Sequence, residues 1–193
     1  RYYYCERDEA LAEIAAENFK VFGLSDTVAV TRGDGMEALA GFDGALDLIF
    51  LDPARRDGRS LRVSALDRCE PNAREHWHRL LARASRVALK TSPGLDVSSA
   101  LADLAAVEAV YVISVENDCK ELLVVGREGF DGEARIHCVN IRKEGTFEEL
   151  SFYLSEEKEL EGDFAPPGRY LLEPNASIMK AGGFKAVSKK WNL

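Results

Sequence analysis

Three carboxylates lie at or just beyond the carboxyl ends of short strand-like runs in the first part of the chain: Glu6, Asp34 and Asp52. Strands of an open α/β sheet place their carboxyl ends at one edge, and ligands bind there. The first of these acids, Glu6, would lie at the end of a strand where a carboxylate can accept both hydroxyl protons of a ribose. The next acid, followed by Gly35 and Met36, suits an exocyclic amine and an apolar adenine face. This pattern indicates a nucleotide-like cofactor whose reacting end faces Asp52.

The elements that must position these side chains follow from hydrophobic periodicity and turn residues. Strands and helices alternate up to Val110–Val115 and Leu122–Val125. These two strands are separated by too few residues for a crossover helix, which predicts an antiparallel hairpin. We expect strands at Tyr2–Cys5, Val28–Thr31, Leu46–Leu51, Arg86–Thr91, Val110–Val115 and Leu122–Val125, and helices at Asp8–Phe22, Met36–Leu39, Pro71–Ala84 and Val97–Ala106. The run Leu46–Leu51 is nearly all apolar, which is typical of a strand buried on both faces of a parallel sheet.

The composition is that of a globular protein. The 193 residues include 25 basic and 33 acidic side chains, giving a net charge of −8, which argues against a wholly basic nucleic-acid coat. The longest apolar run, near Ala45–Leu51, is too short to span a bilayer, and no signal peptide is recognisable, so we expect no membrane association. Four cysteines without Cys-x-x-Cys pairing favour a reducing cytoplasm.

A family resemblance rests on four motifs in order. They are Tyr4-Cys5-Glu6-Arg7-Asp8-Glu9, then Ala16-Glu17-Asn18-Phe19 with Gly23, then Gly33-Asp34-Gly35, then Leu51-Asp52-Pro53-Ala54-Arg55-Arg56. Over roughly the first 127 residues the chain resembles class I S-adenosylmethionine-dependent methyltransferases. The resemblance implies a Rossmann-like sheet of parallel strands with a final antiparallel hairpin, and S-adenosylmethionine as cofactor.

The site residues expected from the motifs fall into three groups. The cofactor would be bound by Glu6, Arg7, Asp34, Gly35, Met36 and Asp52. The reaction would involve Asp52, Pro53 and Arg55, with Asp52 accepting a hydrogen bond from an acceptor amine. The substrate would be held by Arg55, Arg56, Lys185, Lys189 and Lys190.

Methyltransferases of this family have a first strand followed by a glycine-rich turn that holds the methionine part of the cofactor. No such strand and turn are seen before Tyr2. We therefore expect the chain to be an internal piece of a longer protein that lacks the first strand of the sheet. Alone, it should bind the cofactor weakly or not at all.

The sequence pattern changes after Gly126. A strand pair is expected at Arg135–Arg142 and Phe147–Leu154, and the segment from Gly168 to Gly182 resembles the THUMP-like domain of a bacterial methyltransferase group. We expect two domains, a methyltransferase domain at 1–127 and a small, incomplete α+β THUMP-like module at 128–193. THUMP domains bind RNA, so the resemblance implies structured RNA as the substrate.

The residues at the ends of the strands narrow the chemistry of the acceptor. Relatives that methylate carbon 5 of a pyrimidine use a cysteine that directly follows the fifth strand of the family's sheet. At the corresponding place this chain has Thr91-Ser92-Pro93. No aromatic residue follows Asp52-Pro53 to stack a flipped base. We therefore expect transfer to a nitrogen or oxygen atom of RNA.

Alternatives remain open. They are a small-molecule methyltransferase of the same fold and an inactive RNA-binding or scaffold module. A nicotinamide-dependent oxidoreductase is weaker, because no Tyr-x-x-x-Lys motif is present and its sheet should not end in a hairpin. His76 and His78 lie two apart on an expected helix, where side chains diverge, so we expect no metal. The sequence leaves the oligomeric state open.

Overall fold

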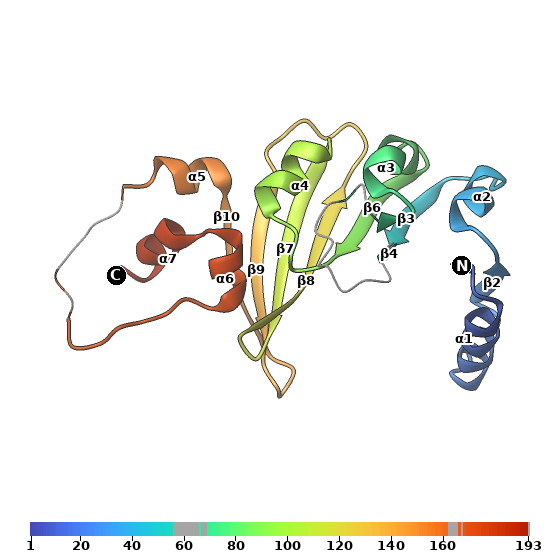
Figure 1. The fold of residues 1–193 in the computed structure, drawn as a ribbon, viewed down its shortest axis with the longest axis horizontal. Coiled ribbons are helices and arrows are strands. Elements are labelled where there is room, and N and C mark those ends of the chain that lie inside the picture. Colours follow the sequence, from blue (N-terminus) through green and yellow to red (C-terminus); the bar gives the residue numbers. More distant parts are fainter. Residues whose placement is uncertain (56–65, 67–68, 162–165, 167, 193) are drawn as a thin grey trace. The chain divides into compact units, whose positions relative to one another are not determined.

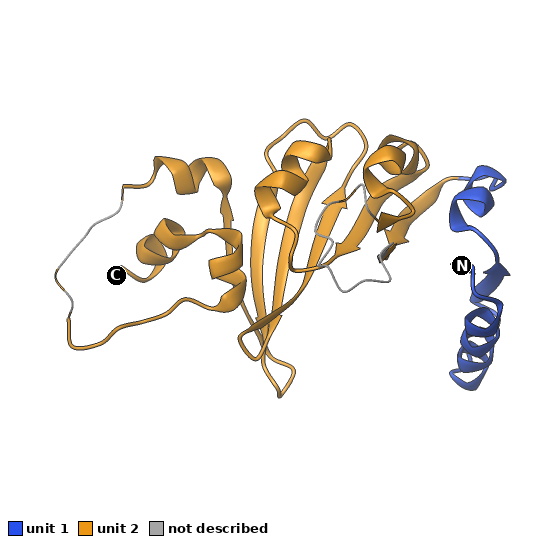
Figure 2. Ribbon diagram, in the orientation of Figure 1, with its two compact units in different colours: residues 1–44 blue, residues 45–193 orange. Residues whose placement is uncertain are grey.

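The computed structural model describes residues 1–55, 66, 69–161, 166 and 168–192 (Figure 1). These residues form two compact units, residues 1–44 and residues 45–193 (Figure 2). None of the helices in this described part is long and apolar enough to cross a membrane.

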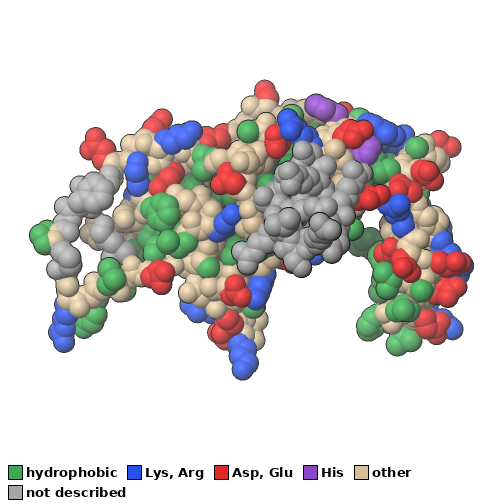
Figure 3. Space-filling model, in the orientation of Figure 1, with side chains coloured by type: hydrophobic (Ala, Val, Ile, Leu, Met, Phe, Trp, Pro, Cys, Tyr) green, Lys and Arg blue, Asp and Glu red, His purple; other side chains and the backbone are tan. Residues whose placement is uncertain are grey.

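The first unit is a parallel strand pair joined by a helix. Its elements are β1 (Tyr2–Glu6), α1 (Glu9–Val21), β2 (Val28–Arg32) and α2 (Gly35–Ala40). Asp8 begins α1 by accepting a hydrogen bond from the Leu11 N–H, and Gly23, with φ +70°, follows its end. Hydrophobic side chains gather at the carboxyl end of α1 (Figure 3), where Val21 and Phe22 are exposed.

The second unit is built on a six-stranded mixed sheet with the order β10-β9-β7-β8-β6-β3. Its strands are β3 (Leu46–Leu51), β6 (Ala84–Thr91), β7 (Val107–Val115), β8 (Asp118–Gly126), β9 (Arg135–Ile141) and β10 (Phe147–Tyr153), with a separate pair of β4 (Ala54–Arg55) and β5 (Cys69–Glu70). Its helices are α3 (Ala73–Leu81), α4 (Val97–Asp103), α5 (Leu154–Glu159), α6 (Ala176–Ala181) and α7 (Phe184–Trp191).

The strand pairing confirms much of the expected order. β3 and β6 are parallel, and β7 and β8 form the expected antiparallel hairpin, with β8 inserted between β6 and β7. β9 and β10 form a second hairpin, and β9 pairs in parallel with β7. The sheet therefore continues past residue 127 through β9 and β10, and the two compact units divide at residue 44. The assignment of a methyltransferase domain to residues 1–127 and a second module to 128–193 stays a prediction.

The two faces of this sheet differ in burial. Val110 and Val112 on one face of β7 are fully buried, and α6 packs against β7, β8 and β9 on that side. The opposite face includes Leu48 and Phe50 of β3, which stay 54% and 57% exposed. The expectation that β3 is buried on both faces is therefore wrong for the described residues. The helices pack on the face of the sheet that carries Ile49 of β3 and its partner Val87 of β6, and Leu48 and Phe50 point to the other face.

Candidate functional site

Three of the predicted cofactor residues come together in the first unit. Register pairs Glu6 with Arg32 at the carboxyl ends of β1 and β2, and the Gly33 N–H donates to the Glu6 carbonyl at 2.9 Å. This brings Glu6, Arg7 and Asp34 to one edge of the strand pair. The Arg7 Nε lies 3.8 Å from Asp34 Oδ2, and both side chains remain accessible to solvent.

Local hydrogen bonds hold both carboxylates in place. Asp34 Oδ1 accepts the Met36 N–H at 2.8 Å and the Glu37 N–H at 3.3 Å, so Asp34 is the N-cap of α2. Glu6 Oε1 accepts the Asp8 N–H at 3.0 Å. Both acids thus have a local structural task, and Gly35 and Met36 follow Asp34 directly at the start of α2.

Cys5 lies beside this edge but is not poised as a nucleophile. Burial, and then the negative charge of Asp34, raise the pKa of the Cys5 thiol above its ordinary value. The thiol is therefore protonated at neutral pH, and a protonated thiol is a poor attacking group.

The second unit places Asp52 in an ion cluster that the sequence did not reveal. Lys90 Nζ lies 2.9 Å from Asp52 Oδ2 and 3.8 Å from Glu121 Oε1, so one lysine joins β6 to the carboxyl end of β3 and to β8. The hydrogen bond with Asp52 raises the pKa of Lys90 despite partial desolvation. A lysine inside the apolar strand Arg86–Thr91 was the available signal, because a charge there needs a partner on a neighbouring strand.

The residues after Asp52 are described only in part. Pro53 is half-buried, and the backbone of Arg55 pairs with Cys69 in the short β4–β5 ladder. Arg56 lies outside the described residues, so its predicted role in substrate binding stays a prediction. Asp52 belongs to the second unit and Glu6 to the first, and their joint action on one cofactor also stays a prediction.

The three predicted RNA-binding lysines lie on α7 but have different surroundings. The Lys185 ammonium donates to the Lys158 carbonyl at 3.4 Å, and the Lys190 ammonium donates to the Glu149 carbonyl at 2.9 Å. Lys189 is exposed and forms no hydrogen bond or ion pair with the described residues. Of the three ammonium groups, only that of Lys189 is therefore uncommitted within the described structure.

The chain is similar to a solved structure over nearly its whole length. This is the crystal structure of a "putative methyltransferase" from Porphyromonas gingivalis W83, with a TM-score of 0.78 and 28% sequence identity. The match covers 97% of this chain and 47% of that one, so the chain spans about half the length of the protein it matches. The mixed α/β arrangement with parallel strands is thus consistent with a methyltransferase-like fold.

Sequence comparisons add a local match. A family model for a ferredoxin-like domain matches residues 170–193, which contain α6 and α7. No curated protein shows significant similarity to the chain. The THUMP-like assignment of residues 128–193 stays a prediction.

Proposed function

We propose that the chain forms part of an S-adenosylmethionine-dependent methyltransferase that acts on a nitrogen or oxygen atom of structured RNA. The methyltransferase-like fold, shared over 97% of the chain with the Porphyromonas gingivalis protein, supports the transferase class. The observation that carries the cofactor assignment is the joint placement of Glu6, Arg7 and Asp34 at the carboxyl ends of β1 and β2.

The residues present fit this cofactor by their chemistry. A carboxylate at the end of β1 suits the two ribose hydroxyls, and the Asp34-Gly35-Met36 turn offers an acceptor for an amine beside an apolar side chain. S-adenosylmethionine supplies an electrophilic methyl group on a sulfonium. The chain's own part is to position the groups, because an in-line displacement depends mainly on alignment and charge complementarity.

Asp52 is the group we assign to the acceptor. Its Oδ2 is held by Lys90, and a carboxylate fixed in this way can accept a hydrogen bond from an amine or hydroxyl on its other oxygen. Pro53 and Arg55 follow it and would border the acceptor. RNA is favoured over a small molecule by the exposed cationic side chain of Lys189 on α7, whose ammonium is uncommitted within the described structure.

The test is calorimetric titration of S-adenosylmethionine into the protein expressed from its complete gene. Glu6→Ala should weaken binding by at least about tenfold, because hydrogen bonds to a charged group contribute about 1.5–3 kcal/mol. Glu17→Ala is the matched control, since Glu17 is an exposed acid on α1 that pairs with Lys20 and with no other described residue. Absence of binding by the unmodified protein would reject the enzyme and leave the RNA-binding scaffold as the better hypothesis.

A further inference from the structure

One face of the six-stranded sheet carries apolar side chains that stay partly exposed in the described structure. Residues paired on neighbouring strands point to the same face, so the register defines this face strand by strand. The pairings place on it, one from each strand, Phe50, Ala88, Leu123, Tyr111, His137 and Ser151. These residues and those two positions away on the same strands form what we call the open face.

The helices α3, α4 and α6 pack on the other face of the sheet. Trp77 of α3 packs over Gly126, the last residue of β8, and the Ser114 hydroxyl of β7 donates to Asn175 Oδ1 at the start of α6. Along their strands, Gly126 and Ser114 alternate with open-face residues and therefore face the other way. α4 connects β6 to the parallel strand β7 in the direction in which α3 connects β3 to β6, so the right-handed crossover puts both helices on one face.

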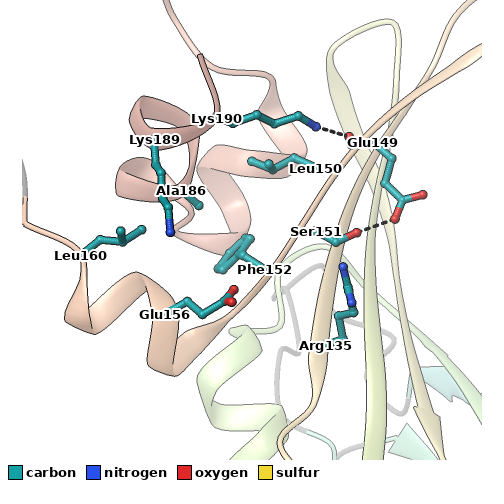
Figure 4. Close-up of a pocket in the computed structure, with 10 residues that line it drawn as sticks. All are labelled: Arg135, Glu149, Leu150, Ser151, Phe152, Glu156, Leu160, Ala186, Lys189 and Lys190. Carbon is teal, nitrogen blue, oxygen red and sulfur yellow. Dashed lines mark hydrogen bonds between the residues drawn. The ribbon is translucent and has the colours of Figure 1, made fainter. Parts of the chain in front are cut away.

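Strand β10 shows the same division (Figure 4). Leu150 and Phe152 point to the side where α7 lies and are 5% and 3% exposed. On that side a groove of about 550 Å³ remains between β10 and the helices α5 and α7. Ser151 and Glu149 point to the other side of the strand, and Phe147, two positions before Glu149, is 66% exposed there. Within the described residues, the open face is therefore left without a covering helix.

The centre of the open face is aliphatic. Its side chains are partly buried and come from three neighbouring strands: Leu123 and Val125 of β8, Ile113 of β7 and Val139 of β9. The opposite side of the same strands is also apolar and is fully buried, as at Val110. Strands that are apolar on both sides are typical of sheets packed on both faces. The sequences of β7 and β8 therefore call for a second covering layer.

The charged groups nearest this centre are paired within the chain. Lys90 Nζ lies 2.9 Å from Asp52 Oδ2 and 3.8 Å from Glu121 Oε1. His137 Nδ1 lies 2.7 Å from Glu149 Oε1. A protein surface can cover paired charges at much lower cost than isolated ones, whereas binding of RNA phosphates depends on free cations. The open face therefore suits a protein partner better than a nucleic acid.

The width of the open face sets the amount of chain needed to cover it. Six strands about 4.8 Å apart span about 24 Å, and one helix with its side chains is about 10–12 Å across, so at least two helices are needed. The Porphyromonas gingivalis protein matches 97% of this chain with only 47% of its own length. A related protein thus holds enough further chain to supply such helices.

We propose that at least two amphipathic helices, from the part of the same protein outside residues 1–193, pack on the open face. Their apolar stripes cover the aliphatic centre around Leu123 and Ile113, and their polar stripes face solvent. The proposal rests on packing and on the pairing of charges. It does not rest on the proposed methyl transfer.

Alkylation of a single introduced cysteine tests whether the open face is covered. Phe50→Cys places a thiol on this face, and Arg79→Cys places a control thiol on the exposed surface of α3. In the 193-residue chain the two thiols should react with iodoacetamide at similar rates, because both positions are exposed. In the protein expressed from its complete gene, Phe50→Cys should react at least about tenfold more slowly, and Arg79→Cys should change less than about twofold. Peptide mass spectrometry quantifies each modified site.

A photo-cross-link identifies what covers the face. p-Benzoylphenylalanine incorporated in place of Phe50 keeps an aromatic side chain at this exposed position. Cross-links within one polypeptide, to residues outside the 193, support the proposal. Cross-links confined to the 193 residues, cross-links between isotope-labelled and unlabelled copies, cross-links to an added oligoribonucleotide, or equal reactivity of Phe50→Cys in both proteins would overturn it. No cofactor is added, so these outcomes leave the methyltransferase proposal standing.

Discussion

Asp34 combines a structural task with its proposed binding role. One carboxylate oxygen accepts two backbone N–H groups at the start of α2, and the other lies near Arg7. Truncation to alanine would therefore remove a helix cap together with a charge, and a cap alone contributes about 1 kcal/mol. Asp34→Asn keeps an acceptor for the cap, so it is the variant that isolates the charge.

Glu108 provides a pH-dependent contribution at the same scale. Burial acts to raise its pKa, but hydrogen bonds from Arg86 and Arg127, at 2.6 and 2.7 Å, outweigh burial and hold the pKa below its ordinary value. A carboxyl whose pKa falls on folding stabilises the native state above its unfolded pKa, and loses that effect as pH falls through its folded pKa.

We therefore expect Glu108→Gln to lower the free energy of unfolding at pH 7 by about 1–3 kcal/mol. The difference from the unmodified protein should shrink as pH falls from the ordinary glutamate pKa through the lower pKa of folded Glu108, where this carboxyl itself becomes protonated. Urea unfolding at a series of pH values measures this, with Glu17→Gln as an exposed control. A difference that stays constant down to pH 2 would contradict the assignment.

At the scale of elements, α6 is fixed to the sheet by one asparagine. Asn175 Oδ1 accepts the Ser177 N–H at the start of α6 and the hydroxyl of Ser114 on β7, both below 3 Å. Its amide donates to Asn117 Oδ1 in the β7–β8 turn at 2.8 Å. Ser114 is fully buried, so these bonds satisfy polar atoms that water does not reach. The helix therefore has one defined position on β7, β8 and β9.

α3 packs closely against the end of β8 because Gly126 has no side chain. A Cβ atom at Gly126, the last residue of β8, would lie 2.4 Å from Trp77 Cζ2 and 3.1 Å from Leu81 Cδ2. Trp77 cannot easily move, because it is 1% exposed and its indole N–H donates to the Ala105 carbonyl at 2.7 Å.

Gly126→Ala should therefore destabilise the protein by about 1–3 kcal/mol through overpacking. Gly168→Ala is the control, since a Cβ there meets no atom of the described residues within 4 Å, and we expect a change within about 0.5 kcal/mol. Thermal unfolding of both variants, followed by tryptophan fluorescence, makes the comparison. Equal melting temperatures for the two variants would show that α3 shifts freely.

At the scale of the whole molecule, the two units differ in how much apolar side chain they bury. In residues 1–44 only Ala12 is buried, and Leu11 and Ile14 of α1 are more than half exposed. In the second unit, β7 and β8 alone contribute Val110, Val112, Leu122 and Val124, all fully buried. Apolar burial is the main source of stability, so the first unit should open more readily.

Hydrogen exchange of the 193-residue chain tests this. Amides of β1 and β2 should exchange at least about tenfold faster than those of β7 and β8, because a difference of about 1.4 kcal/mol in opening free energy gives that factor. Addition of S-adenosylmethionine to the complete gene product should slow exchange at β1 and β2. Equal protection in both units would show that they unfold as one.

Local patterns in the sequence determined most elements and their order. The strand and helix periodicities, the β7–β8 hairpin and the Glu6 and Asp34 positions at strand ends all follow from spacing and turn residues, which act over a few positions. The Lys90–Asp52 pair, the register of β9 against β7 and the groove beside β10 were decided only by tertiary structure. Each joins residues tens of positions apart, and periodicity shows which face of a strand is apolar but not which neighbour or helix covers it. The open face at Leu48 and Phe50 has the same cause.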